Sequence, residues 1–96
     1  MLTWFEARRS TQLAKYDREN PKMGELLREL DALYLFGTIG MEAVLKADGS
    51  VLVSMDDAWD QPNAPPPRWR PATIPERTAS LVIARKRIPE VDSRCL

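Results

Sequence analysis

The fold class of this chain depends on residues 37–59, which read GTIGMEAVLKADGSVLVSMDDAW. Two runs rich in apolar residues are separated here by a short polar stretch that contains Asp48-Gly49. Because Asp-Gly pairs favour tight reversals between strands, this stretch predicts an antiparallel β-hairpin. A two-residue loop would leave both faces of the hairpin with mixed polarity. A three-residue loop over 47–49 instead separates one apolar face from one mostly polar face, and we take it as the predicted register.

This register pairs Lys46 with Ser50 and places Gly49 in the left-handed position of the bulge that follows a type I turn. The predicted apolar face consists of Ile39, Met41, Ala43, Leu45, Val51, Val53, Met55 and Trp59. The opposite face consists of Gly40, Glu42, Val44, Lys46, Ser50, Leu52, Ser54 and Asp56. We expect helices to cover the apolar face and to form the core with it.

Two helices are predicted before the hairpin. The first spans residues 3–19 and opens with a T-x-x-E capping box. Phe5, Leu13 and Tyr16 fall on one side of it, but Arg9 and Gln12 interrupt this apolar side. The second is capped by Asn20, has Pro21 at its first position and ends at Gly37. Its apolar residues repeat at three- and four-residue intervals: Met23, Leu26, Leu27, Leu30, Leu33 and Tyr34. We expect this leucine-rich face to pack on the apolar face of the hairpin.

A proline-rich loop is predicted over residues 60–75. Its six prolines exclude a helix or a central strand through most of the segment. Pro65-Pro66-Pro67 predicts a short polyproline II element, and Trp69 is the expected anchor that packs the loop down. Residues 68–70 are candidates for a short third strand beside the hairpin, because a sheet of two strands is only marginally stable.

A C-terminal helix is predicted after this loop. Thr73-Ile74-Pro75-Glu76 repeats the capping box, and Pro89 marks the end of the helix near residue 88. Its predicted inner face consists of Ile74, Thr78, Leu81, Val82, Arg85 and Ile88. We expect Leu81 and Val82 to cover the apolar face of the hairpin together with the leucine-rich face of the second helix. Residues 89–96 are expected to be a tail. The predicted fold is therefore one small α+β domain spanning residues 1–96.

The composition is that of an ordinary soluble domain, with 44% hydrophobic and 29% charged residues. No apolar run approaches the ~18 residues that a membrane span requires. Charged residues from Glu6 to Arg9 follow the first residues directly, so a secretory signal is not expected. The single cysteine, Cys95, cannot form an internal disulfide, and the expected compartment is the cytoplasm.

The residue types argue against an enzyme. The chain contains no histidine, which removes the commonest general base and metal ligand. Its four glycines form no phosphate-binding loop, and one cysteine cannot build a zinc cluster. Carboxylates near the hairpin could bind Mg²⁺ or Ca²⁺, but their spacing matches no calcium loop. We therefore expect no metal, no cofactor and no catalytic site.

The charges are unevenly distributed along a chain whose net charge is zero. Residues 38–60 hold five acids and one base, whereas residues 61–96 hold seven bases and three acids. The two parts can neutralise each other within the fold, or either can contact a partner. We expect a small non-enzymatic protein that binds and occludes a partner protein, as bacterial immunity proteins, antitoxins and phage-borne inhibitors do. The expected contacts with a basic partner surface are Glu42, Asp56, Asp57 and Asp60.

Two alternatives remain open. The first is a nucleic-acid-binding accessory protein in which Trp69 stacks on a base, although the sequence pI of about 6.3 is unusual for that class. Its contacts would be Arg68, Trp69, Arg70, Arg85, Lys86 and Arg87. The second is a structural subunit or homodimer in which the exposed edge of the hairpin pairs with a copy of itself.

Overall fold

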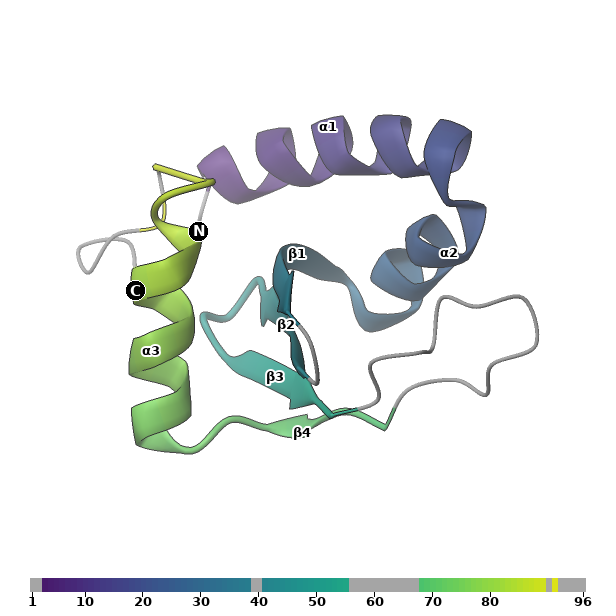
Figure 1. Cartoon of the computed structure of the whole chain (residues 1–96). Coiled ribbons are helices and arrows are strands. Elements are labelled where there is room, and N and C mark those ends of the chain that lie inside the picture. Colours follow the sequence, from purple (N-terminus) through teal and green to yellow (C-terminus); the bar gives the residue numbers. More distant parts are fainter. Residues whose placement is uncertain (1–2, 39–40, 56–67, 90, 92–96) are drawn as a thin grey trace.

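The computed structural model describes residues 3–38, 41–55, 68–89 and 91. Within them, three helices surround a four-stranded antiparallel sheet, and the predicted α+β class is confirmed (Figure 1). The elements in chain order are α1 (Thr3–Glu19), α2 (Pro21–Leu30), β1 (Ala32–Thr38), β2 (Met41–Lys46), β3 (Val51–Ser54), β4 (Arg70–Pro71) and α3 (Ile74–Ala84). The strands lie in the order β1-β2-β3-β4. None of the helices described is long and apolar enough to cross a membrane.

The hairpin of β2 and β3 has the predicted register. Leu45 pairs with Val51, and the backbone N–H of Lys46 donates to the carbonyl of Ser50 over 2.8 Å. Between them, Gly49 has a φ of 92°, the left-handed conformation that the predicted bulge requires. The alternation of apolar and polar residues was therefore sufficient to select the correct pairing.

The second helix is shorter than predicted, and a strand follows it. Asp31 ends α2 in a left-handed conformation with φ and ψ both 52°, and its N–H donates to the carbonyl of Arg28. The predicted helix over residues 21–37 was wrong in its last part, which forms β1 and pairs with β2 along its length. Leu33 and Tyr34 continue the helical period in the sequence, but this uncharged, aromatic-rich run also suits a strand. Pairing with β2 decides between the two.

Each face of the sheet has its own hydrophobic core. The first contains Phe5, Leu33, Leu35, Phe36, Ala43, Leu45, Val51, Val53, Ala84, Ile88 and Val91. The second contains Met23, Leu27, Ala32 and Val44. The leucine-rich face of α2 was predicted to cover the apolar face of the hairpin, and this was wrong. It packs on the opposite face, where Val44 is fully buried and Leu52 partly so, while α3 covers the apolar face (Figure 1).

Most of the predicted apolar hairpin face that the structure describes is buried as expected. The exception is Met55, which follows β3 and is 61% exposed, so its assignment to the core was wrong. Met41 is partly buried against the first core. Ile39 and Trp59 lie outside the described residues. A β-bulge between Tyr34 and Phe36 adds one residue to β1 and lets both Leu35 and Phe36 enter the first core.

The α3 helix begins as predicted but turns a different face to the sheet. Thr73 and Glu76 form the predicted capping box, with the Thr73 N–H donating to the Glu76 carboxylate over 2.8 Å. The helix ends at Ala84, one turn before the predicted end, and its buried residues are Ser80 and Ala84. These small side chains allow close contact between the helix and the sheet. The predicted inner face was right at Leu81 and Ile88, which pack in the first core. It was wrong at Ile74, Thr78, Val82 and Arg85, which are all exposed.

The end of the proline-rich segment joins the sheet. Arg70 pairs with Val53 and Pro71 with Leu52, which confirms a short additional strand beside the hairpin. It spans residues 70–71 and not the predicted 68–70. Trp69 packs against the second core, as expected of the anchor of this loop. The polyproline element predicted at residues 65–67 lies outside the described residues.

Candidate functional site

The predicted acidic contact surface is described only at Glu42. Its carboxylate accepts a hydrogen bond from the Tyr34 hydroxyl, and the pair lies so close to Gly37 that a Cβ atom there would collide with both. Burial, followed by this hydrogen bond, raises the pKa of Tyr34 far above its usual value. Glu42 is thus half-buried and engaged inside the fold. Asp56, Asp57 and Asp60 lie outside the described residues.

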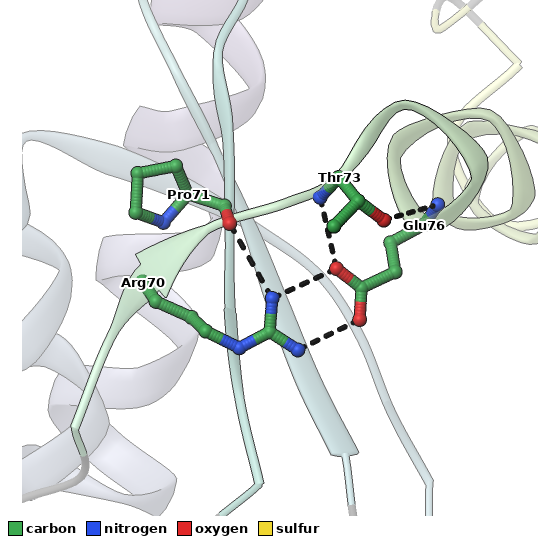
Figure 2. Close-up of polar contacts among 4 residues, drawn as sticks. All are labelled: Arg70, Pro71, Thr73 and Glu76. Atoms are coloured by element: carbon green, nitrogen blue, oxygen red, sulfur yellow. Dashed lines mark hydrogen bonds and ion pairs between the residues drawn. The ribbon is translucent and has the colours of Figure 1, made fainter.

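The basic segment next to β4 is also engaged within the protein. The guanidinium of Arg70 forms two parallel hydrogen bonds with the carboxylate of Glu76, at 2.8 and 2.7 Å (Figure 2). Glu76 simultaneously completes the capping box with Thr73. The neighbouring Trp69 is partly buried against the second core. Arg70 and Trp69 therefore secure the junction of β4 and α3.

The Arg70–Glu76 pair predicts a specific dependence of stability on pH. The hydrogen bonds from Arg70, and then the Thr73 N–H, lower the pKa of Glu76 to about 2. A carboxyl whose pKa is lowered on folding stabilises the protein above its unfolded pKa, near 4.5, and loses that contribution as the pH falls toward 2. Glu76→Gln keeps a residue that suits the capping box but removes the charge. We expect its melting temperature to lie below wild type at pH 7 and to converge on it between about pH 4.5 and 2.

The matched control is Glu29→Gln, the same substitution at an exposed position of α2. Calorimetric melting curves of the three proteins across this pH range provide the measurement. A Glu76→Gln deficit that stays constant down to pH 2 would contradict the role assigned to the ion pair.

The basic residues 85–87 do not converge with Arg68 and Arg70. They form the turn after α3, at the end of the helix opposite to β4 (Figure 1). Arg87 instead lines a cleft of about 240 Å³ together with residues of α1 and β1. The lining residues are Arg8, Thr11, Gln12, Lys15, Tyr16, Tyr34, Leu35, Arg87 and Ile88. We call this the basic cleft.

Arg8 and Lys15 were not predicted to be members of a site. They lie seven residues apart, with Thr11 between them, so the helical period places the three on one face of α1. Tyr16 was predicted to lie on the apolar side of this helix, and its ring packs edge-on against the ring of Tyr34, with the ring centres 6.2 Å apart. The helical period of α1 could therefore have grouped Arg8 with Lys15 from the sequence. That Arg87 lies next to them could not be predicted, because it depends on how the chain folds.

A larger groove of about 760 Å³ lies between α1, the end of α2 and the hairpin turn. Arg9 lies in it, but its guanidinium already donates to the carbonyls of Leu27 and Ala32, both over 3.1 Å. Asp48 is hydrogen-bonded to the N–H and hydroxyl of Ser50, which lowers its pKa. These polar groups stabilise the fold, and the groove offers no arrangement that resembles a catalytic pair among the described residues.

The outward side of α3 is the second unusual surface. Its exposed residues are Ile74, Pro75, Thr78, Ala79, Val82 and Ile83, none of which is charged. The two charged residues of the helix point elsewhere, since Glu76 binds Arg70 and Arg77 donates to the carbonyl of Gly49 over 3.2 Å. A surface helix normally has the reverse polarity, with apolar residues inside and charges outside.

No protein-family model matches the chain. No curated protein and no solved structure is significantly similar to it either. The function must therefore be inferred from these two surfaces alone.

Proposed function

We propose that this protein is a non-enzymatic protein-binding module and that the outward side of α3 is its contact surface. The observation that supports this is the reversed polarity of the helix. Ile74 is 83% exposed and Val82 is 50% exposed, whereas Glu76 and Arg77 form hydrogen bonds within the protein. Exposed aliphatic side chains on a helix whose two charged residues are engaged within the protein favour association with another surface.

The spacing of this surface suits a helix that docks in a groove. Pro75, Thr78, Ala79 and Val82 follow the i, i+3, i+4, i+7 pattern of residues that face one side of a helix. All four are exposed, and Ala79 at the centre is small enough to allow close approach of a partner backbone. At 1.5 Å per residue, the 11-residue helix presents about 16 Å of such surface.

The charges beside this surface indicate the chemistry of the partner. Arg85 and Lys86 follow the helix directly and are both exposed. A partner groove that is apolar at its centre and has aspartate or glutamate at the matching end would complement this arrangement. The proposed occupant is therefore an apolar groove with an acidic rim on another protein.

A second copy of the chain fits this surface less well. An antiparallel pair of α3 helices would place the bases of one copy at the N-terminus of the other helix, which already has partial positive charge. A parallel pair would bring the two groups of bases together. Either arrangement adds electrostatic repulsion to an interface that is only about 16 Å long.

Within this class, a cytoplasmic inhibitor of the immunity-protein or antitoxin kind is the form that best fits a small chain without histidine. Such a protein acts by occupying its partner and needs no chemistry of its own. Contact of Asp56, Asp57 and Asp60 with the partner stays a separate prediction, since it concerns residues outside the described ranges.

Site-specific photo-crosslinking in the native host tests the proposal. A photoreactive amino acid at position 82 of the full chain should form one protein adduct, mapped to an apolar groove bordered by aspartate or glutamate. Position 14, which is exposed in α1, is the control position and should not form this adduct. Ala79→Asp should abolish the adduct, because it places a carboxylate against an apolar, acid-rimmed surface. The same substitution at Ala14 should leave it intact.

Three results would overturn the proposal. They are the absence of an adduct at position 82 beyond that at position 14, an adduct only with a second copy of the chain, and an adduct that Ala79→Asp leaves unchanged. Circular dichroism of both Asp variants would show that the helices are still folded.

A further inference from the structure

The basic cleft joins cations that are far apart in the sequence. Arg8 and Lys15 come from α1, and Arg87 comes from the turn after α3. Figure 1 shows this turn lying beside α1. No acidic side chain is among the described residues that line the cleft. The fold therefore concentrates positive charge in a chain whose net charge is zero.

The wall of the cleft is held in place by hydrogen bonds. Gln12 binds the backbone of Tyr34 at both ends of its amide, donating to the carbonyl over 2.7 Å and accepting from the N–H over 2.9 Å. This contact joins α1 to β1, which is the edge strand of the sheet. The rings of Tyr16 and Tyr34 pack against each other next to it. A site between α1 and β1 is thus largely formed before any ligand binds.

Besides Arg8, three groups in the cleft can bind an anion. They are the ammonium of Lys15, the guanidinium of Arg87 and the hydroxyl of Tyr16. Lys15 and Arg87 are exposed cations, and the ammonium of Lys15 lies 5.5 Å from the centre of the Tyr16 ring. Burial is the main factor that raises the pKa of Tyr16, so its hydroxyl stays protonated and able to donate. Arg8 already has a partner within the protein, and anion binding by the other three groups does not require its guanidinium to be free.

Two carboxylates are close enough to influence the tyrosines. Glu19 and Glu42 both contribute to the raised pKa of Tyr16. Neither lines the cleft, and Glu42 is engaged by the hydroxyl of Tyr34. Among the described residues, the charge that faces the cleft is therefore positive.

The size of the cleft limits what it can bind. At about 30 Å³ of liquid per water molecule, 240 Å³ corresponds to roughly eight waters. This is below the ~300–1,000 Å³ of sites that enclose a drug-sized ligand. The cleft therefore encloses a single compact charged group, and any larger carrier would extend into solvent.

We propose that the basic cleft binds a phosphomonoester dianion, either inorganic phosphate or the end of a small phosphorylated molecule. The forked N–H groups of Arg87 suit two phosphate oxygens, and Lys15 adds a second charge. This site is separate from the outward side of α3 and does not depend on the proposed docking function.

The structure favours this ligand over a nucleic-acid backbone. A backbone is followed by a continuous series of cations. Here the other basic segment lies at the opposite end of α3, and Arg70 in it is paired with Glu76 (Figure 2). The cations of the cleft thus form one compact group.

Isothermal titration calorimetry and amide NMR on the full chain test the proposal. The probes are inorganic phosphate, glycerol 3-phosphate, chloride at equal ionic strength, and an oligonucleotide without terminal phosphates. Both phosphate probes should bind, with amide shifts centred on residues 8–16, 34 and 87, and chloride should not. Tighter binding of glycerol 3-phosphate than of phosphate would identify a carried phosphate as the ligand, and the reverse order would identify the free ion. Arg87→Gln and Lys15→Gln should each weaken binding on the order of tenfold, as expected for a charged hydrogen bond.

Arg85→Gln is the matched control, since it removes the same charge from the same turn outside the cleft. It should change phosphate affinity by less than about twofold, because exposed charges at a distance are screened. Equal weakening by Arg85→Gln and Arg87→Gln would overturn the proposal in favour of a general charge effect. Chloride binding as tightly as phosphate, or an unphosphorylated oligonucleotide competing for the same amides, would also overturn it.

Discussion

Replacing Phe36 by alanine is expected to destabilise the protein severely. The side chain is fully buried in the first core, directly after the β-bulge of β1. Removing a buried phenyl ring costs about 3–5 kcal/mol, from lost transfer energy and the cavity that remains. A domain of this size has a total stability of only about 5–15 kcal/mol. We therefore expect the melting temperature to fall by on the order of 20 °C, measured by circular dichroism.

Two controls make this result specific. Phe36→Leu keeps most of the volume and should cost less than about 1.5 kcal/mol. Met55→Ala shortens another large apolar side chain, but one that is 61% exposed, and should change stability by less than about 0.5 kcal/mol. A cost for Met55→Ala close to that of Phe36→Ala would contradict the position of Met55 outside the core.

Replacing Arg9 by methionine is expected to have the second largest effect. Its guanidinium donates to the carbonyl of Leu27 near the end of α2 and to that of Ala32 at the start of β1. These bonds satisfy carbonyls at a helix end and join three elements through one side chain. Charged hydrogen bonds of this kind contribute about 1.5–3 kcal/mol, so the loss of both should cost on the order of 3 kcal/mol. Urea unfolding monitored by tryptophan fluorescence would measure it.

The matched control is Arg28→Met, which removes an arginine of similar apparent importance. Arg28 forms two hydrogen bonds with Asp17, but both side chains are about half exposed. Exposed ion pairs contribute about 0–1 kcal/mol, because water and salt screen them. If the two variants were equally stable, the role assigned to Arg9 as a link between α1, α2 and β1 would be wrong.

Local sequence patterns predicted the elements whose ends are set by nearby residues. The three-residue turn at 47–49 follows from the alternation of its flanking strands, and the start of α3 follows from Thr73 and Glu76. The bounds of α1 were also predicted correctly. In these cases the interactions that determine the structure lie within a few residues of each other.

The same patterns failed where a distant contact decides the outcome. Leu33 and Tyr34 match the period of the preceding helix, and only pairing with β2 shows that they belong to a strand. In α1, Arg9 and Gln12 interrupt the apolar face and weakened it as a sequence signal. Both turn inward to bind backbone groups of α2 and β1. Their partners are 18 to 23 residues away, beyond what periodicity can show.

For the candidate surfaces too, local sequence predicted some features and only the fold decided others. Residues 85–87 were predicted from the sequence to be a contact segment, and they are exposed. They were grouped with Arg68 and Arg70, which the fold places at the other end of α3. Ile74, Thr78 and Val82, on the outward side of α3, were predicted to face inward, whereas Ser80 and Ala84 are the residues of the helix that are fully buried. Close packing against the sheet selects the smaller residues.

The stretch over residues 37–59 by itself determined that the chain contains an antiparallel hairpin with a three-residue turn. Its apolar alternation allows only one register that separates the two faces. The tertiary structure alone decided that both faces are covered, since Val44 becomes fully buried and Leu52 partly buried only when α2 packs over them. It also decided which cations meet in the basic cleft. Alternation is a property of neighbouring residues, whereas the covering of a face depends on segments that the chain brings together only on folding.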